Sequence, residues 1–128
     1  MNRPLISVAI PAYNEASNLD ELFERLRAVF QINSDKFDFE IVVCENGSKD
    51  DSYAKLNAWR EIDSRIRVIR LSRNFHMEGG MMAALSDVRG DACVIMSADL
   101  QDPPEMISEM IKLWATGIDH VYTIISFR

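Results

Sequence analysis

The apolar residues of this chain follow two periods that alternate along the sequence. Short, nearly continuous apolar runs are typical of strands covered on both faces, whereas apolar residues three or four positions apart are typical of helices with one buried face. The short runs predict strands at 5–10, 39–44, 66–71, 92–96 and 120–125. The helical spacing fills the segments between them, at 19–30, 54–62, 81–88 and 106–114.

Polar and turn-forming residues mark the ends of the predicted helices. Ser17 is suited to cap the first helix, and Ser48 with Asp51 repeats the pattern before the second. Gly90 is expected to end the third helix. Pro103-Pro104 is expected to open the fourth, because proline is tolerated in a first helical turn.

Strand and helix thus alternate four and a half times within 128 residues. This order is typical of a mostly parallel sheet with helices on both faces and right-handed crossovers. The predicted fold class is therefore α/β and Rossmann-like, with residues 1–128 as a single domain. No helix follows the last predicted strand before Arg128, so we expect the chain to be part of a longer protein.

Composition and charge narrow the class of protein. The chain is 48% apolar and its net charge is −6, the wrong sign for a protein that neutralises many phosphates, which argues against a nucleic-acid partner. A signal peptide and an apolar stretch of the ~18 residues that span a bilayer are both missing, which predicts a cytoplasmic chain. Cys44 and Cys93 lie in apolar runs and are expected to be buried, reduced thiols.

Polar turns follow the first four predicted strands, at 11–15, 45–48, 72–76 and 97–102. Ligands of open α/β sheets lie beyond the carboxyl ends of the strands, so we expect these turns to converge on one site. The first turn lacks GxGxxG, and Gly-Lys-Ser/Thr does not occur in the chain. Phosphates bound at this edge would instead need a metal held by carboxylates.

The fourth turn carries three oxygen ligands within four residues. Asp99 follows a predicted buried strand, and Gln101 and Asp102 come next. One or two carboxylates, with water and substrate phosphates, suffice for Mg²⁺ or Mn²⁺. Alternatively, Asp99 and Asp102 cap the helix that Pro103-Pro104 opens, and both interpretations can hold at once.

The other turns offer groups that recognise nucleotides. Tyr13 can stack on a base and Glu15 can accept from a ribose hydroxyl or a base N–H; alternatively, they are a strand-end plug and a solvated acid. Glu45 is a ribose or base acceptor by analogy with dinucleotide folds, or part of an ordinary Asn-Gly turn. Arg73 and Asn74 can hold phosphate or brace the turn that contains Glu45.

Taken in order, these turns resemble the motifs of family 2 glycosyltransferases. The matching segments are Pro-Ala-Tyr-Asn-Glu at 11–15, Glu-Asn-Gly-Ser-Lys-Asp at 45–50, Leu-Ser-Arg-Asn-Phe at 71–75 and Ala-Asp-Leu-Gln-Asp-Pro-Pro-Glu at 98–105. They are most similar to the polyprenyl-phosphate hexosyltransferases, which use dolichol or bactoprenol phosphate. The resemblance covers 6–128, and four motifs in order at strand ends make it specific.

The resemblance implies a GT-A fold that binds a nucleoside-diphosphate sugar and inverts its anomeric carbon. Pro11, Tyr13, Glu15 and Glu45 match the family positions that hold the nucleoside. The implied acceptor is a polyprenyl phosphate, and the parent protein is implied to act at the cytoplasmic face of a membrane through a part absent from this chain.

The resemblance also implies a metal-binding carboxylate. Asp99 matches the second acid of the Asp-x-Asp motif and is the expected catalytic residue; with Gln101 it would hold Mg²⁺ or Mn²⁺ on the diphosphate. Arg128 is similar in place to an arginine that reaches the diphosphate. The expected donor contacts are completed by Ser97, Arg73 and Asn74.

Three positions depart from the family pattern. Ser97 stands where the motif has its first acid, Glu45-Asn46 replaces Asp-Asp, and His76 replaces the glycine after Arg-Asn-Phe. A loop histidine is more often exposed than catalytic, so a general-base role for His76 is not favoured. The sequence therefore predicts the donor-binding half of a UDP- or GDP-hexose transferase, inactive alone; the alternative is a noncatalytic nucleotide-binding or interaction module with the same fold.

Overall fold

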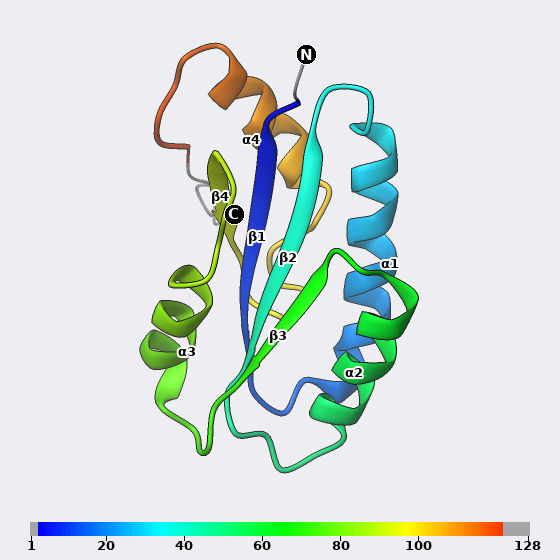
Figure 1. Cartoon of the computed structure of the whole chain (residues 1–128), viewed down its shortest axis with the longest axis vertical. Helices are drawn as coiled ribbons and strands as arrows, with labels where there is room; N and C mark the ends of the chain where they lie inside the picture. Colours follow the sequence, from blue (N-terminus) through cyan, green and yellow to red (C-terminus); the bar gives the residue numbers. More distant parts are fainter. Residues whose placement is uncertain (1–2, 122–128) are drawn as a thin grey trace, which may run out of the picture.

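The computed structural model describes residues 3–121, in which strands and helices alternate strictly along the chain (Figure 1). The elements are β1 (Leu5–Ala12), α1 (Ala16–Ile32), β2 (Asp38–Glu45), α2 (Ser52–Ile62), β3 (Ile66–Arg70), α3 (His76–Leu85), β4 (Ala92–Ile95) and α4 (Met106–Ala115). The first four predicted strands are confirmed to within two residues at either end.

The four strands form one parallel sheet in the order β3-β2-β1-β4. β2 and β3 therefore lie on one side of β1, and β4 lies on the other side. The order reverses between β1 and β4, and this switch point leaves a crevice at the carboxyl ends of the strands. The predicted α/β, Rossmann-like parallel sheet is confirmed.

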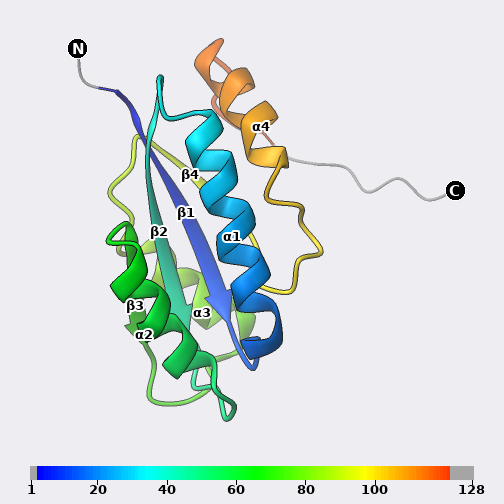
Figure 2. The ribbon, with the colours of Figure 1, turned by 90° about the vertical axis from the view of Figure 1, so that its right-hand side faces the viewer.

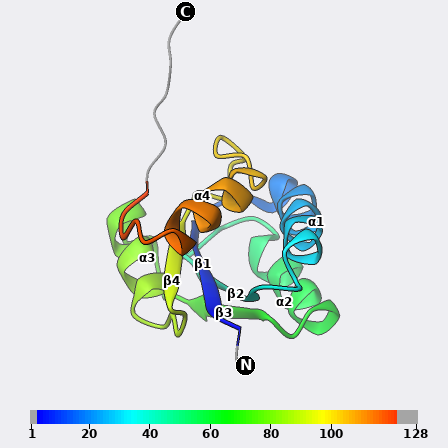
Figure 3. The same cartoon turned by 90° about the horizontal axis from the view of Figure 1, so that it is seen from above.

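Helices cover both faces of the sheet, as Figures 2 and 3 show. On one face, the apolar stripe of α1 packs against alternate residues of β1 and β2, and α2 and α4 extend this core. On the other face, α3 packs over β1 and β2 through the small residues Ala9, Val42, Cys44 and Ala84. Successive side chains of β1 and β2 point to opposite faces, and helices bury both faces. This explains why the two strands have continuous apolar runs.

The start of α1 differs from the prediction. The helix begins at Ala16 and has no capping side chain of its own, so the expected cap at Ser17 is wrong. The backbone N–H groups of Glu15 and Ala16 instead donate to Ser52 Oγ at 3.0 Å and Asp50 Oδ2 at 3.2 Å. Side chains from the turn before α2 therefore satisfy the donors at the start of α1.

The limits of α3 and α4 also differ from the prediction. α3 ends at Leu85 rather than Gly90, because the Gly90 N–H donates to Ser7 Oγ at 2.8 Å and is fixed beside β1. α4 begins at Met106, after a turn in which the Met106 N–H donates to the Pro103 carbonyl at 3.1 Å. The proline pair thus precedes the helix and does not open it.

Cys44 is buried but Cys93 is exposed, so the expectation of two buried thiols is wrong for Cys93. Cys93 pairs with Ser7 across the β1–β4 ladder and lies on the α3 face of the sheet. Because α3 packs over β1 and β2, this face of β4 is left uncovered among the described residues.

Two further expectations concern the end of the chain. Residues 120 and 121 are irregular, and the remainder of the predicted strand at 120–125, like Arg128, lies outside the described residues. Across the described part of the chain, α1 to α4 are all too short or too polar to cross a membrane.

Candidate functional site

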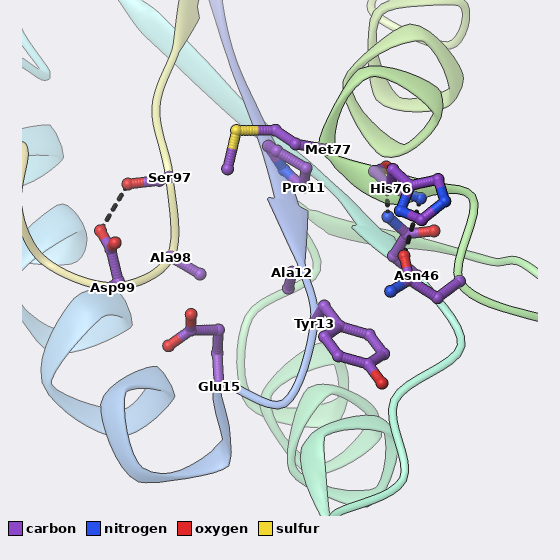
Figure 4. Close-up of a pocket in the computed structure, with 11 residues that line it drawn as sticks. Pro11, Ala12, Tyr13, Glu15, Asn46, His76, Met77, Ser97, Ala98 and Asp99 are labelled. Atoms are coloured by element: carbon purple, nitrogen blue, oxygen red, sulfur yellow. Dashed lines mark hydrogen bonds between the residues drawn. The ribbon is translucent and has the colours of Figure 1, made fainter.

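An open cavity of about 310 Å³ lies at the switch point of the sheet, at the carboxyl ends of the strands (Figure 4). This volume is at the lower end of the range for small-molecule sites. All four predicted turns contribute to it, as expected. Its lining residues are Pro11, Ala12, Tyr13, Glu15, Asn46, Asn74, His76, Met77, Ser97, Ala98 and Asp99.

The turn after β1 forms the floor of the cavity and is locked to the turn after β2. Asn14 adopts a left-handed conformation with φ of 52°, which asparagine tolerates better than most residues. Its N–H donates to Ser48 Oγ at 2.8 Å, and its Oδ1 accepts the Lys49 N–H at 2.8 Å. This reciprocal pair fixes the backbone at Asn14, between Tyr13 and Glu15.

Glu15 lines the cavity while its own carboxylate is oriented by α1. Asn18 Nδ2 donates to Glu15 Oε2 at 2.8 Å. In Figure 4 this carboxylate points towards the turn that carries Ala98 and Asp99. The cavity therefore has two half-buried acids, one from the turn after β1 and one from the turn after β4.

Asp50 stabilises the turn after β1 by accepting the Ala16 N–H at the start of α1. Partial burial by itself raises the pKa of Asp50, but hydrogen bonds from the Ser52 hydroxyl, the Ser52 N–H and the Ala16 N–H lower it overall. Asp50 is therefore ionised near neutral pH and stabilises the positive end of α1.

Asp99 is the acid of the turn after β4. Its Oδ1 accepts the Ser97 hydroxyl at 2.5 Å and the Gln101 N–H at 3.1 Å, which fixes the carboxylate in the cavity. The intervening Leu100 has a left-handed φ of 66°, so the chain turns sharply here. Ser97, which replaces an acid of the family motif, thus contacts Asp99 directly.

The three expected oxygen ligands do not gather at one place. The Gln101 side chain is exposed and Asp102 lies by a separate hollow next to Met106 and Met110. No side chain caps α4, so the alternative capping role is wrong. Within residues 3–121, three or more His, Cys, Asp or Glu side chains nowhere come together as a metal-binding group.

Glu45 is not among the residues that line this cavity. The residue is 1% exposed, and its Oε1 accepts the Ser48 N–H at 2.8 Å. It borders a second open hollow of about 300 Å³ with Gly47, Arg70 and Ser72. Glu45 therefore borders a different hollow from Tyr13 and Glu15.

Of the two predicted residues in the turn after β3, Asn74 and Arg73, the structure brings one to the cavity. Asn74 lines the cavity, but the Arg73 guanidinium lies 3.9 Å from the centre of the Phe75 ring. Asn74 Oδ1 accepts the His76 N–H at 2.7 Å, so Asn74 also shapes the start of α3.

Sequence reasoning missed Asn46. This residue is 2% exposed, yet it lines the cavity and joins β2 to α3. Its Nδ2 donates to the His76 carbonyl at 2.7 Å and its Oδ1 accepts the Phe75 N–H at 2.9 Å. The available signal was an asparagine directly after a buried strand, but its two partners lie about 30 residues away in sequence.

The parallel sheet with a polar cavity at its switch point matches the fold of solved GT-A glycosyltransferases. A mannosyltransferase from Pyrobaculum calidifontis, solved with GDP-Man and Mn²⁺, superposes with a TM-score of 0.74 at 24% identity over 90% of this chain and 33% of its own. Staphylococcus aureus TarS (residues 1–349), solved with UDP-GlcNAc, superposes with a TM-score of 0.68 at 19% identity over 87% of this chain and 31% of its own.

The chain belongs to glycosyl transferase family 2, whose sequence profile matches residues 7–127. An uncharacterized glycosyltransferase of Synechocystis, sll0501, is 39% identical over 117 residues, or 91% of this chain. The undecaprenyl-phosphate 4-deoxy-4-formamido-L-arabinose transferase of Pseudomonas syringae is 38% identical over 124 residues, or 96% of this chain. The chain spans 36% of the length of each of these relatives.

Proposed function

We propose that residues 1–128 form the donor-binding domain of an inverting glycosyltransferase that moves a hexose from a UDP- or GDP-sugar to a polyprenyl phosphate. The observation that carries the proposal is the cavity at the switch point, in which the turn after β1 faces Asp99 in a chain of family 2. A relative that uses undecaprenyl phosphate supports the acceptor class, and neighbours solved with GDP-Man or UDP-GlcNAc support the donor class.

In this proposal, the nucleoside lies over the turn after β1. Pro11 gives an apolar floor, Tyr13 an aromatic face and Glu15 a carboxylate for ribose hydroxyls or base N–H groups. We also assign Glu45 to the nucleoside. Because Glu45 borders the hollow beside Ser48 and not the cavity of Tyr13 and Glu15, this contact would require its side chain to leave the Ser48 N–H.

The chain's own residues fit a diphosphate-bound metal ion in a limited way. Asp99 Oδ1 accepts the hydrogen bonds from Ser97 and Gln101, so Oδ2 is the oxygen that would meet the ion. Mg²⁺ or Mn²⁺ commonly takes one or two carboxylates together with substrate phosphates and water. Gln101 would have to turn inward to join. When bound, the ion would neutralise negative charge on the leaving diphosphate.

A phosphate acceptor explains why the site needs no strong general base. Such an acceptor is already anionic at neutral pH, so the main demand on the protein is to stabilise charge on the leaving diphosphate. We assign Arg128 to that charge and the parent protein to the cytoplasmic face of a membrane. The acceptor-binding residues lie outside this chain in our proposal, and the 128 residues alone transfer no sugar.

Calorimetry with UDP, GDP and ADP, each with and without Mn²⁺, tests the proposal. We expect saturable heats for UDP or GDP that require the metal, and weaker heats for ADP. Failure of both UDP and GDP to bind a chain that is folded by circular dichroism would contradict it.

The second candidate function is a noncatalytic nucleotide-binding module. Ser97 favours it, because this residue replaces an acid of the metal-binding motif. Incubation of the parent protein with a UDP- or GDP-hexose and undecaprenyl phosphate separates the two functions. A lipid-linked sugar product supports the enzyme, and tight binding without product supports the module.

A further inference from the structure

We propose that His76 contacts the nucleoside of the donor and contributes to the choice between uracil and guanine. The inference rests on the proposed function, which leaves His76 without a role. The side chain lines the same cavity as Asp99.

The cavity has two chemically different sides. In Figure 4, Ser97 and Asp99 lie on one side, and Tyr13, Asn46 and His76 lie on the other. If Asp99 marks the diphosphate, the side with an aromatic ring, an amide and an imidazole receives the nucleoside. These three groups offer stacking and hydrogen bonding, which are the interactions that a base requires.

The backbone of His76 is fixed from two directions. Its N–H donates to Asn74 Oδ1 at 2.7 Å, and its carbonyl accepts from Asn46 Nδ2 at 2.7 Å. Its φ is 66°, a left-handed conformation that persists in non-glycine residues only where the surroundings impose it. Because Asn46 is buried, the direction in which the imidazole leaves the chain is set by the sheet.

The imidazole itself is available to a ligand. Across the described residues, none of the hydrogen bonds or ion pairs occupies its ring nitrogens, whereas its backbone donor and acceptor are both used. A neutral imidazole carries one donor and one acceptor that point in different directions, so it can make one hydrogen bond to a base, either to a C=O or from an N–H group. Uracil and guanine differ in where those groups lie, so a fixed imidazole discriminates between them.

The chain has two histidines, which makes proton NMR a direct test. His120 lies beside a separate hollow with Cys93 and Trp114 and is the matched control. The two imidazole C–H signals are assigned with His76→Asn and His120→Asn, and UDP and GDP are then added with Mg²⁺. We expect the His76 signals to move to saturation with the nucleotide that binds, and the His120 signals to stay in place.

Binding constants give the second readout. Loss of a hydrogen bond in the site corresponds to about 1 kcal/mol, so His76→Asn is expected to weaken the better nucleotide about fivefold and change the UDP-to-GDP ratio of Kd. His76→Gly, which removes the ring and keeps the left-handed backbone, should do the same. His120→Asn should leave both values unchanged.

The outcomes separate this inference from the proposed function. Nucleotide binding with unmoved His76 signals, or with an unchanged ratio of Kd in both His76 variants, overturns the role of His76 and leaves the donor site standing. Absence of binding by UDP and GDP to the folded wild-type chain overturns both.

Discussion

Asn14, His76 and Leu100 are residues other than glycine with a left-handed backbone, and each lies in a turn after a strand. These turns follow β1, β3 and β4 and border the cavity. Strained backbone of this kind is concentrated at functional sites, where surrounding contacts impose it. The sequence could suggest such a turn at Asn14 and, more weakly, at His76, because asparagine and histidine are enriched in this conformation; leucine is not.

The strain at His76 can be measured by substitution. We expect His76→Gly to be more stable than His76→Ala by about 1 kcal/mol, because alanine keeps the left-handed penalty and glycine does not. Urea unfolding of both variants gives the difference. Equal stability, or a more stable alanine variant, would show that residue 76 leaves this conformation in solution.

Gly47 brings the turn after β2 against the turn after β3. A Cβ atom there would lie 2.3 Å from the Arg73 carbonyl carbon, and its φ is 73°. Gly117 has a φ of 106°, and no atom of residues 3–121 lies within 4 Å of the corresponding position, so it supplies a control with strain but no clash. We expect Gly47→Ala to lower the free energy of unfolding by about 2 kcal/mol more than Gly117→Ala does. Similar losses in thermal or urea unfolding would argue against this close contact.

At the scale of elements, a buried polar cluster joins three strands to the segment between α3 and β4. Glu40 of β2 is 6% exposed; it accepts from Ser7 Oγ at 2.5 Å and from the Arg89 N–H at 2.7 Å. Arg67 of β3 pairs with the other Glu40 oxygen at 2.6 Å. These bonds fix the return of the chain to β4 and therefore the position of the turn that carries Asp99.

Glu40→Gln tests this cluster. The amide keeps the shape but leaves Arg67 with less compensating charge, so we expect a loss of about 2 kcal/mol in the free energy of unfolding. Glu24→Gln, on the exposed face of α1, is the matched control and should change stability by less than about 0.5 kcal/mol. Equal effects of the two substitutions would show that the cluster contributes nothing.

Two buried carboxylates, Glu40 of this cluster and Asp63 beside Arg65, predict that acid destabilises the fold. Burial alone raises the pKa of Glu40, but the Ser7 hydroxyl, the Arg89 N–H and the charge of Arg67 lower it overall. Hydrogen bonds from Arg65 likewise lower the pKa of Asp63. Since both pKa values are lower in the folded than in the unfolded state, their stabilisation is present above the unfolded values and is lost as pH falls through the folded ones.

Unfolding midpoints between pH 6 and pH 3 measure this loss. We expect the wild-type midpoint to fall steadily below about pH 4.5, and the Glu40→Gln variant to lose less over the same interval. Parallel curves for the two proteins would exclude Glu40 as a source of the acid sensitivity.

At the scale of the whole molecule, the alternation of periods was sufficient to predict the sheet and its two helical layers. Contacts between distant turns were not predictable from local pattern. The donors at the start of α1 are satisfied by Asp50 and Ser52, and Cys93 is exposed because α3 packs over β1 and β2.

The candidate site, like the fold, was predicted in its main residues but not in its side-chain contacts. The motifs identified Tyr13, Glu15 and Asp99, which the fold brings to one cavity. They did not reveal that Glu45 borders a different hollow or that Gln101 is exposed. The direction of the Gln101 side chain depends on the left-handed backbone of Leu100 before it.

If Asp99 supports metal-dependent binding of a nucleoside diphosphate, its replacement by asparagine must remove the metal-dependent heat in calorimetry. UDP and GDP are titrated with Mn²⁺ into the wild type, Asp99→Asn and a control, Asp35→Asn, which is exposed between α1 and β2 at the opposite edge of the sheet. We predict that Asp99→Asn abolishes the metal-dependent heat while Asp35→Asn retains it. Undiminished Mn²⁺-dependent binding by folded Asp99→Asn would contradict the account.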